Sequence, residues 1–366
     1  MYVHPKFIPA ALTLIMVATS VQAQVTLTPI DEKYAADEVR DLMVSVADAD
    51  VTVNTSDVST VEVQVTVEGD DRDKAMDYYE KQNFSVTLDR GTLHVNSKSE
   101  RTRGTLYVWR NSVNIHVAIN MPSNISSNIR TSDGDLVIGE LTAGATIVTS
   151  DGDIEAAWLE GASVSVKTSD GDISILAASS EKIAIQTSDG DIEAGRLEGA
   201  SISIRTSDGD LELGDVAGDL QIQTSDGDIL IDSINGKLDA KTSDGDLVIG
   251  EVISSDAEVR TSDGEITIGT ATGSLTLRTS DGDVALGLVD PENINVTISS
   301  GDALLTMLQN QPATLNIRAT DIEMDSFSNF SGDLDDSRVD GDLNGGGALI
   351  RVHISDGDVV MRAKEQ

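Results

Sequence analysis

The 366-residue chain has no cysteine, few aromatic residues and few basic residues. Without cysteine it cannot form disulfides, thiolate zinc sites, a cysteine nucleophile or a lipidated N-terminal cysteine. The 25 Lys and Arg residues stand against 63 Asp and Glu, and the resulting net charge of −38 repels phosphate backbones and anionic lipids. Nucleic-acid binding and peripheral membrane binding are therefore disfavoured. Apolar residues make up 39% of the chain, which is enough for a folded core.

The N-terminus has the features of a secretory signal peptide. A short basic start precedes a mostly apolar run, Phe7 to Val17, that is too short to span a bilayer. Small residues suitable for cleavage follow at Val21-Gln22-Ala23. We therefore expect residues 1–23 to be removed and Gln24 to begin the mature protein. The alternative, a buried N-terminal helix, is disfavoured by a proline in the run and by the lack of amphipathic spacing.

The rest of the chain contains no apolar run long enough for a transmembrane helix and no anchor motif. Together with the signal peptide, this predicts an exported protein that is not inserted in the membrane. The expected location is the periplasm, the cell surface or the extracellular space.

One string, Thr-Ser-Asp-Gly, recurs every 18 or 19 residues over much of the chain. A degenerate copy occupies residues 298–301, and a last copy occupies residues 354–358. A period of this length is typical of stacked repeats, in which each repeat is one turn of a solenoid. The complete copies begin at Thr131, Thr149, Thr168, Thr187, Thr206, Thr224, Thr242, Thr261 and Thr279.

Apolar and polar residues alternate on both sides of the string, which is the period of a strand with one buried face. Ile204 precedes Thr206 by two residues, for example, and Leu211 follows it by five. The same parity places the threonine inside, and Ile298 and Ile354 support this because isoleucine suits an interior position. Each repeat therefore predicts two short strands. In the turn between them we expect glycine to take a positive φ and Ser and Asp to bond nearby amides.

A single repeat buries too few apolar side chains to offset the conformational entropy lost when it becomes ordered. Stacked repeats can fold because every coil then bonds to two neighbours and shares one interior. We therefore predict an all-β fold, a parallel β-solenoid of about ten regular coils and roughly 50 Å in length at ~4.8 Å per coil. The apolar spacing lacks the period of left-handed hexapeptide helices, so the right-handed form is favoured.

Changes in composition mark the ends of the repeat array. Residues 24–130 hold most of the aromatic residues and alternate as strands around one helix, expected from Asp73 to Gln82. We expect this segment to form an irregular N-terminal cap. Residues 131–302 are the regular Thr-Ser-Asp-Gly-Asp coils. Residues 303–366 carry degenerate repeats and a Gly-rich stretch before a final strand pair, and they are expected to form the last coils and the C-terminal cap.

These features resemble the putative-adhesin family of bacterial envelope proteins with β-strand repeats, a domain family of unknown function. The shared elements are the alternating strand with its acidic follow-on at 61–71 and the strand at 113–117 that leads towards Thr131. The repeated Ser-Asp-Gly-Asp and its closing copy at 355–358 complete the pattern, which covers nearly all of the mature chain. The resemblance implies a right-handed β-helix-like fold and export, and it implies no catalytic residues. The uniform, Asp-rich repeats of this chain depart from the family pattern.

Stacking aligns the two acidic residues of each repeat into two columns. Neighbouring carboxylates ~4.8 Å apart repel by roughly 1 kcal/mol even in water. The first column comprises Asp133, Asp151, Asp170, Asp189, Asp208, Asp226, Asp244, Asp263 and Asp281. The second comprises Asp135, Asp153, Asp172, Asp191, Asp210, Asp228, Asp246, Glu265, Asp283 and Asp302. We expect part of the repulsion to be offset by the outward-facing basic residues just before the threonines: Arg130, Lys167, Arg205, Lys241, Arg260 and Arg278.

Two interpretations of the columns stay open. Calcium, a hard cation that takes carboxylate oxygens, could bind the members from Asp133 to Asp246. The repeat is neither the calcium-binding β-roll repeat nor an EF-hand, so the motif itself does not support calcium. We favour the alternative, in which the aspartates cap turns, keep the surface soluble and prevent lateral pairing. No other cofactor is predicted.

Catalysis is the main rival function, because polysaccharide lyases and hydrolases occur on β-helices. Such enzymes need one carboxylate pair or a calcium-linked base, and aromatic platforms for sugar, whereas the acidic pairs here are repeated. His94 and His116 alternate with apolar strand residues, which is typical of outward structural positions, and His353 is the only other histidine after the signal peptide. Trp158 could stack on a sugar, but a single aromatic beside Leu159 is more typical of a packed edge. Ice binding by ranked threonines is disfavoured because these threonines face inward.

The sequence thus predicts an exported, acidic β-solenoid that acts by interaction at the cell surface or in the envelope, with adhesion as the expected role and no enzymatic activity. Its partner would be a protein or a glycan surface. The alternatives are a carbohydrate-active β-helix enzyme and a periplasmic regulatory partner protein.

Overall fold

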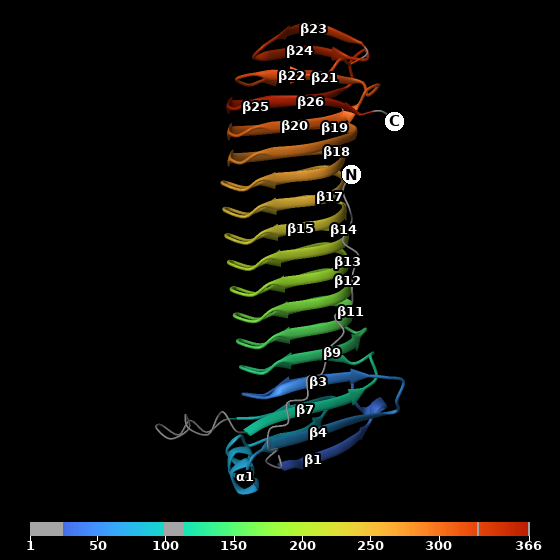
Figure 1. Cartoon of the computed structure of the whole chain (residues 1–366). Coiled ribbons are helices and arrows are strands. Elements are labelled where there is room, and N and C mark those ends of the chain that lie inside the picture. Colours follow the sequence, from blue (N-terminus) through green and yellow to red (C-terminus); the bar gives the residue numbers. More distant parts are fainter. Residues whose placement is uncertain (1–24, 99–112, 328, 365–366) are drawn as a thin grey trace, which may run out of the picture.

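The computed structural model describes residues 25–98, 113–327 and 329–364. These residues form a column of stacked coils, and all 26 strands belong to one sheet that winds around a single apolar interior (Figure 1). The fold is the predicted β-solenoid, with about ten regular turns. The signal peptide predicted at 1–23 lies outside the described residues. Within the described ranges, no helix is long and apolar enough to cross a membrane.

The regular coils pair in parallel with the coils above and below. In most of them the strand after one turn continues through the opposite corner into the strand before the next turn, so that single strands of 13 to 17 residues connect consecutive turns. The strands of this region are β8 (Ser126–Arg130), β9 (Leu136–Leu141), β10 (Ala145–Val148), β11 (Ile154–Lys167), β12 (Ile173–Gln186), β13 (Ile192–Arg205), β14 (Leu211–Gln223), β15 (Ile229–Asn235), β16 (Leu238–Lys241), β17 (Leu247–Arg260), β18 (Ile266–Asp281) and β19 (Val284–Ser300).

Equivalent residues of successive coils lie directly above one another. Ile202 of β13 pairs with Ile183 of β12, and both side chains are buried. The difference between 18- and 19-residue repeats is taken up at the corner opposite the Ser-Asp-Gly turn, where the register between β13 and β14 shifts at Gly199 and Ser201. The turn is therefore constant in length, because an extra residue there would break the files of buried side chains.

The N-terminal cap is not ordered along the axis as it is in sequence. β2 (Asp41–Ser45) pairs with β8, and β3 (Asp50–Thr55) pairs with β9, so this coil lies directly beneath the first repeat. The segment that lies between β3 and β8 in the sequence forms the end of the solenoid (Figure 1). It contains β4 (Thr60–Gly69), β5 (Ser85–Asp89), β6 (Thr92–Asn96) and β7 (Val113–Met121), with β1 (Val25–Ala35) paired to β4 and a 3-10 helix, η1 (Ala36–Glu38).

The helix predicted over 73–82 is present as α1 (Arg72–Lys81). It begins at Asp71, whose carboxylate accepts hydrogen bonds from the N–H groups of Asp73 and Lys74, both at 3.1 Å. This is a helix N-cap, which satisfies backbone donors that have no partner within the helix.

The C-terminal strands also depart from sequence order. β25 (Ala348–Asp356) pairs with β19, and β26 (Val359–Lys364) pairs with β20 (Ala303–Leu308). The last copy of the repeat therefore lies inside the column, and the segment that precedes it in sequence covers the end (Figure 1). That segment contains β21 (Ala313–Arg318), β22 (Ile322–Met324), β23 (Phe330–Asp335) and β24 (Arg338–Leu343).

Candidate functional site: the acidic columns and the adjoining face

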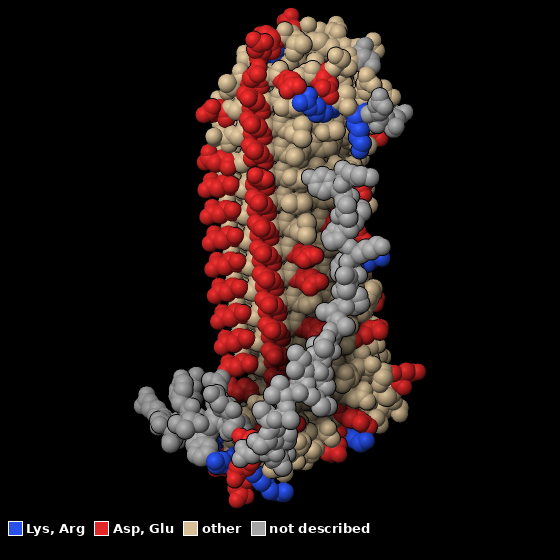
Figure 2. Space-filling view, in the orientation of Figure 1, with Lys and Arg blue, Asp and Glu red and all other residues tan. Residues whose placement is uncertain are grey.

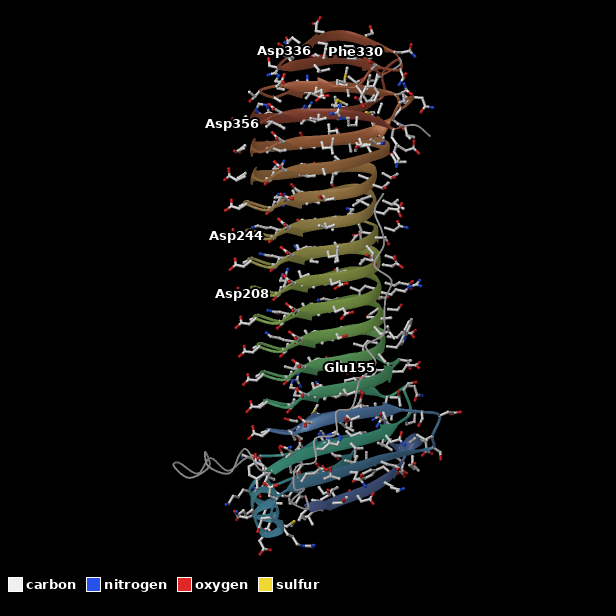
Figure 3. All side chains as sticks on the ribbon, in the orientation of Figure 1. Glu155, Asp208, Asp244, Phe330, Asp336 and Asp356 are labelled. Carbon is white, nitrogen blue, oxygen red and sulfur yellow. The ribbon has the colours of Figure 1, made fainter. Side chains whose placement is uncertain are left out.

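Two columns of carboxylates run along the molecule on the Ser-Asp-Gly-Asp turns (Figure 2). Members of the first column, such as Asp208 and Asp244, lie at the outer edge of the turns (Figure 3). The side chains of both columns are exposed. The columns therefore form the most extended charged surface of this face.

The threonine of each turn is a buried link between coils. Thr206 is 7% exposed, and its Oγ1 lies 3.1 Å from the carbonyl oxygens of both Ser188 and Gly190 in the preceding coil. The same oxygen accepts the N–H of Gly209 at 3.3 Å. The inward position of the threonines is as predicted, and each hydroxyl satisfies backbone groups that would otherwise be buried without a partner.

Backbone bonds also fasten each turn to the one before it. The N–H groups of Ser207 and Asp208 both donate to the carbonyl oxygen of Ser188, at 2.9 and 3.1 Å. The same arrangement recurs in the neighbouring coils. The turns are therefore stacked rigidly, and the side chain of Asp208 is left to project into solvent.

The turn glycines are required by close packing. A β-carbon on Gly209 would lie 1.9 Å from the carbonyl oxygen of Gly190, because the turns stack directly on one another. The prediction of a positive φ at this position was wrong for the regular copies. Positive φ occurs in the degenerate copies, at Gly301 and Gly357, and at several glycines of the opposite corner, such as Gly218.

The second column is a hydrogen-bonded ladder. The backbone N–H of Asp228 donates to Oδ1 of Asp210 at 2.9 Å, and the N–H of Asp210 donates to Oδ1 of Asp191 at 2.8 Å. Across the described coils the donor–acceptor distance is 2.8 to 3.1 Å. The accepting side chains are Asp50, Asp135, Asp153, Asp172, Asp191, Asp210, Asp228, Asp246, Asp283, Asp302 and Asp358.

The N-terminal end of this ladder was not predicted from the sequence, whereas the other end lies at the last copy of the repeat, residues 354–358. Asp50 lies below Asp135, with Ala49 in the position of the turn glycine, and Asp358 accepts the N–H of Asp321 at 3.1 Å. The signal for Asp50 is weak, since only an acidic residue directly before the alternating strand at 51–53 marks it. The ladder therefore reaches from the N-terminal cap to the C-terminal cap, with one gap at Glu265, whose side chain is not among the acceptors in the described coils.

The basic residues before the threonines were expected to offset the repulsion in the columns. Arg260 instead pairs with Asp239, at 3.4 Å, and with Glu258. Arg278 also pairs with Glu258. These partners lie on strands, because the residue before the threonine projects sideways from the coil and not towards the turn. For these two arginines the expectation was wrong.

Metal binding and catalysis both need side chains that converge. Among the residues that the structure describes, no three His, Asp or Glu side chains are grouped so that they could hold a metal ion. Calcium binding by the members from Asp133 to Asp246 stays the untested alternative to the interpretation that we favour. His94 and His116 lie on β6 and β7, which pair with β2 and β3 of the same coil, and His353 lies on β25 near the other end of the molecule.

Trp158 is 36% exposed, and its Nε1 donates to Oε2 of Glu160 at 3.3 Å. The pKa shifts that stand out lie in the caps. Burial and a hydrogen bond to Glu32 raise the pKa of Tyr34 to about 12. The backbone N–H of Ala363 and the guanidinium of Arg362 lower the pKa of Asp325. These perturbed groups are structural and lie away from the columns.

The sheet face that follows the turns carries an uncharged surface that sequence reasoning missed. We name it the uncharged stripe: Val248, Gly250, Thr267, Gly269, Ala285, Gly287, Leu304 and Thr306. A shallow groove of about 490 Å³ lies over its upper part. The signal was present in the sequence, because positions six and eight after each threonine are uncharged from Thr242 onwards, whereas Glu155, Glu193 and Glu212 occupy the first of these positions in earlier repeats.

The Toastrack DUF4097 family model matches residues 39–235 and 216–362. The chain belongs to this family. The resemblance to a family of unknown function with β-strand repeats is thereby confirmed. No curated protein matches the chain.

Several solved structures are similar over most of their length. A putative lipid binding protein from Parabacteroides distasonis is 16% identical, with 78% of this chain and 96% of that chain covered and a TM-score of 0.29. A putative adhesin from the same species is 10% identical, with 93% and 97% covered and a TM-score of 0.29. A putative adhesin from Parabacteroides merdae is 12% identical, with 93% and 96% covered and a TM-score of 0.26. At these values the similarity carries no argument about function.

Proposed function

We propose that the chain is an exported, non-enzymatic interaction protein of the cell surface or envelope, and that adhesion is its role. The observation that carries this proposal is the ladder of the second column, in which the repeated carboxylates bind the protein's own backbone. The most numerous candidates for chemistry are thus used to hold the coils together. We therefore expect other molecules to bind to the outer surface of the solenoid.

The charge supports an interaction with a partner that is not itself strongly anionic. A net charge of −38 keeps molecules of this protein apart from one another and from phosphate-rich surfaces. Stacked coils also make an extended, stiff surface, which is the property that other solenoid proteins use for binding.

The rival function is a carbohydrate-active enzyme, and purified full-length protein separates the two. We expect incubation with a panel of acidic and neutral polysaccharides to yield neither new reducing ends nor unsaturated uronates. Activity that is lost when one carboxylate is changed, and kept when its equivalents in other coils are changed, would overturn the proposal. Such a result would identify one coil as a unique site, as enzymes of this fold require.

The second rival is a periplasmic regulatory role with a soluble protein partner. Immobilised full-length chain is incubated with envelope extract and, separately, with glycan arrays, each in the presence of free polyglutamate. The competitor removes ligands that bind through charge alone. Retention of a glycan or of a surface protein supports adhesion, whereas retention restricted to a soluble periplasmic protein favours regulation.

A further inference from the structure

The uncharged stripe combines exposed apolar side chains with an acidic border. Leu304 and Val248 are 42% and 41% exposed, which is high for large apolar residues. Half of the stripe is the file of residues six positions after the threonines and after Ile298: Val248, Thr267, Ala285 and Leu304. A member of the second column lies two residues before each of them. A carboxylate is therefore the next outward-facing neighbour on the same strand, ~7 Å away. These bordering residues are Asp246, Glu265, Asp283 and Asp302.

Part of the groove over the stripe is lined by glycines, Gly269 and Gly287. Gly250, Gly269 and Gly287 follow one another in consecutive coils and are packed so closely that a β-carbon on Gly287 would lie 2.1 Å from the carbonyl oxygen of Gly269. Val289 and Leu304, both exposed, line the groove, and Lys364, which pairs with Leu308 on the side away from the carboxylates, also lines it. In Figure 2 the upper part of this face, beside the second column, carries few acidic side chains compared with the lower part.

Charge decides which occupants this surface accepts. A second copy of the chain would bring a net charge of −38 against the acidic border, and an anionic lipid surface would be repelled in the same way. A basic segment with an apolar face would instead place its apolar side chains on the stripe and its Lys or Arg side chains on the carboxylates. Apolar contact and charge are then both complementary.

The spacing of the coils favours a helix as that segment. Carboxylates of the border recur every ~4.8 Å along the column. Side chains on one face of an α-helix recur every ~5.4 Å, whereas those on one face of a strand recur every ~6.7 Å. Over the four coils of the stripe, the mismatch accumulates to about 2 Å for a helix and about 6 Å for a strand. Only a helix therefore stays in step with the column.

We propose that the uncharged stripe, with its border of carboxylates, docks a basic amphipathic helix of a partner protein. This inference rests on the proposed interaction function and adds the chemistry of the partner. The lower half of the same face is a poorer site, because Glu155 and Glu193 flank Ser174 in the file next to the second column, two residues before the exposed Leu176.

The test uses the full chain and a fluorescent peptide of about 14 residues, built from Leu and Lys so that a helix has one apolar and one basic face. A peptide of the same composition in scrambled order is the control. Binding is measured by anisotropy at roughly 0.15 M salt, where long-range attraction is screened. We expect the amphipathic peptide to bind about tenfold more tightly than the scrambled one.

Variants distinguish apolar docking from simple charge attraction. Leu304→Glu and Val248→Glu each add negative charge, so charge attraction alone would tighten binding of a basic peptide. We expect both to weaken it by about tenfold, because each buries a carboxylate under the peptide's apolar face. Leu176→Glu makes the same change on the same face outside the stripe, and we expect it to leave binding unchanged or slightly tighter.

The proposal is overturned if the two stripe variants bind as tightly as the unaltered chain, or if the scrambled peptide binds equally well. An unaltered circular dichroism spectrum and melting temperature establish that a variant folds. Two stripe variants are made so that the test can still be read if one of them fails to fold. The outcome is separate from that of the proposed function. A chain found in the envelope that fails the peptide test rejects the docking site alone, and enzymatic activity rejects the proposed function whatever the peptide does.

Discussion

The ladder of the second column predicts that two aspartates of one turn differ sharply in their contribution to stability. Asp210 accepts the N–H of Asp228 at 2.9 Å through Oδ1. Asp208 is exposed, and in the described part of the structure its side chain makes no hydrogen bond or ion pair. The substitutions Asp210→Ala and Asp208→Ala remove the same charge, two residues apart, from columns of the same spacing. The pair therefore separates hydrogen bonding from repulsion.

The magnitudes follow from these two terms. A hydrogen bond to a charged group contributes about 1.5–3 kcal/mol, and removing one carboxylate relieves repulsion of up to roughly 1 kcal/mol from each neighbour in the column. The relief is common to both variants and cancels in the comparison. We expect Asp210→Ala to be less stable than Asp208→Ala by about 1.5–3 kcal/mol, and Asp208→Ala to equal or exceed the unaltered chain. Asp210→Asn keeps Oδ1 as an acceptor, so it should be close to the unaltered chain.

Urea unfolding of the full chain gives the difference in free energy of unfolding, and hydrogen exchange at the amide of Asp228 gives a local measure. The local measure is needed because stacked repeats can open without unfolding as a whole. Exchange at Asp228 should be faster in Asp210→Ala and unchanged in Asp208→Ala. Equal loss of stability in the two alanine variants, or unaltered exchange at Asp228 in both, would refute the ladder as a structural device.

Three further predictions concern the turn and the columns. Thr206→Val should lower the free energy of unfolding by about 2 kcal/mol, and Thr206→Ser should restore it, whereas equal melting temperatures would contradict the role of the hydroxyl. Gly209→Ala should cost about 3 kcal/mol or more in the same unfolding assay, since its β-carbon would meet the carbonyl of Gly190, while Ser207→Ala should be neutral. Calcium and magnesium at equal ionic strength should give equal melting temperatures, because the second column already binds backbone amides, and a rise specific to calcium would reveal a bound ion.

The strands and the inward threonines could be predicted because both depend on local alternation. The parity of Ile204 and Thr206 fixes which side chains enter the core, whatever the neighbouring coils are. A single repeat also buries too few apolar side chains to fold on its own, which requires the repeats to stack. Period and parity together therefore determined the solenoid.

Contacts between coils could not be predicted in the same way. Whether Asp210 bonds an amide of the next coil depends on how one turn lies over another, and the string Thr-Ser-Asp-Gly-Asp alone does not specify this. The role of Gly209 was mistaken for the same reason, since the crowding comes from Gly190 in the coil below.

The order of the caps also lay beyond local reasoning. β25 has the alternation of any other repeat strand, and nothing in its sequence distinguishes pairing with β19 from a place at the end of the column. In the structure, Asp356 pairs with Ser300, and the N–H of Asp358 donates to Oδ1 of Asp302. Only these acidic residues of the last repeat link β25 to its place beside β19. The sequence therefore predicted a closing repeat but not its insertion beneath β21 and β22.

The most direct test of a function in the envelope is fractionation of bacterial cells that express the full chain with a C-terminal tag. Cytoplasm, periplasm, membranes and medium are probed for the tag, and the N-terminus of the recovered protein is sequenced. We expect the protein in the periplasm, on the surface or in the medium, beginning at Gln24. Recovery from the cytoplasm with residues 1–23 still attached would contradict export and, with it, an interaction at the cell surface or envelope.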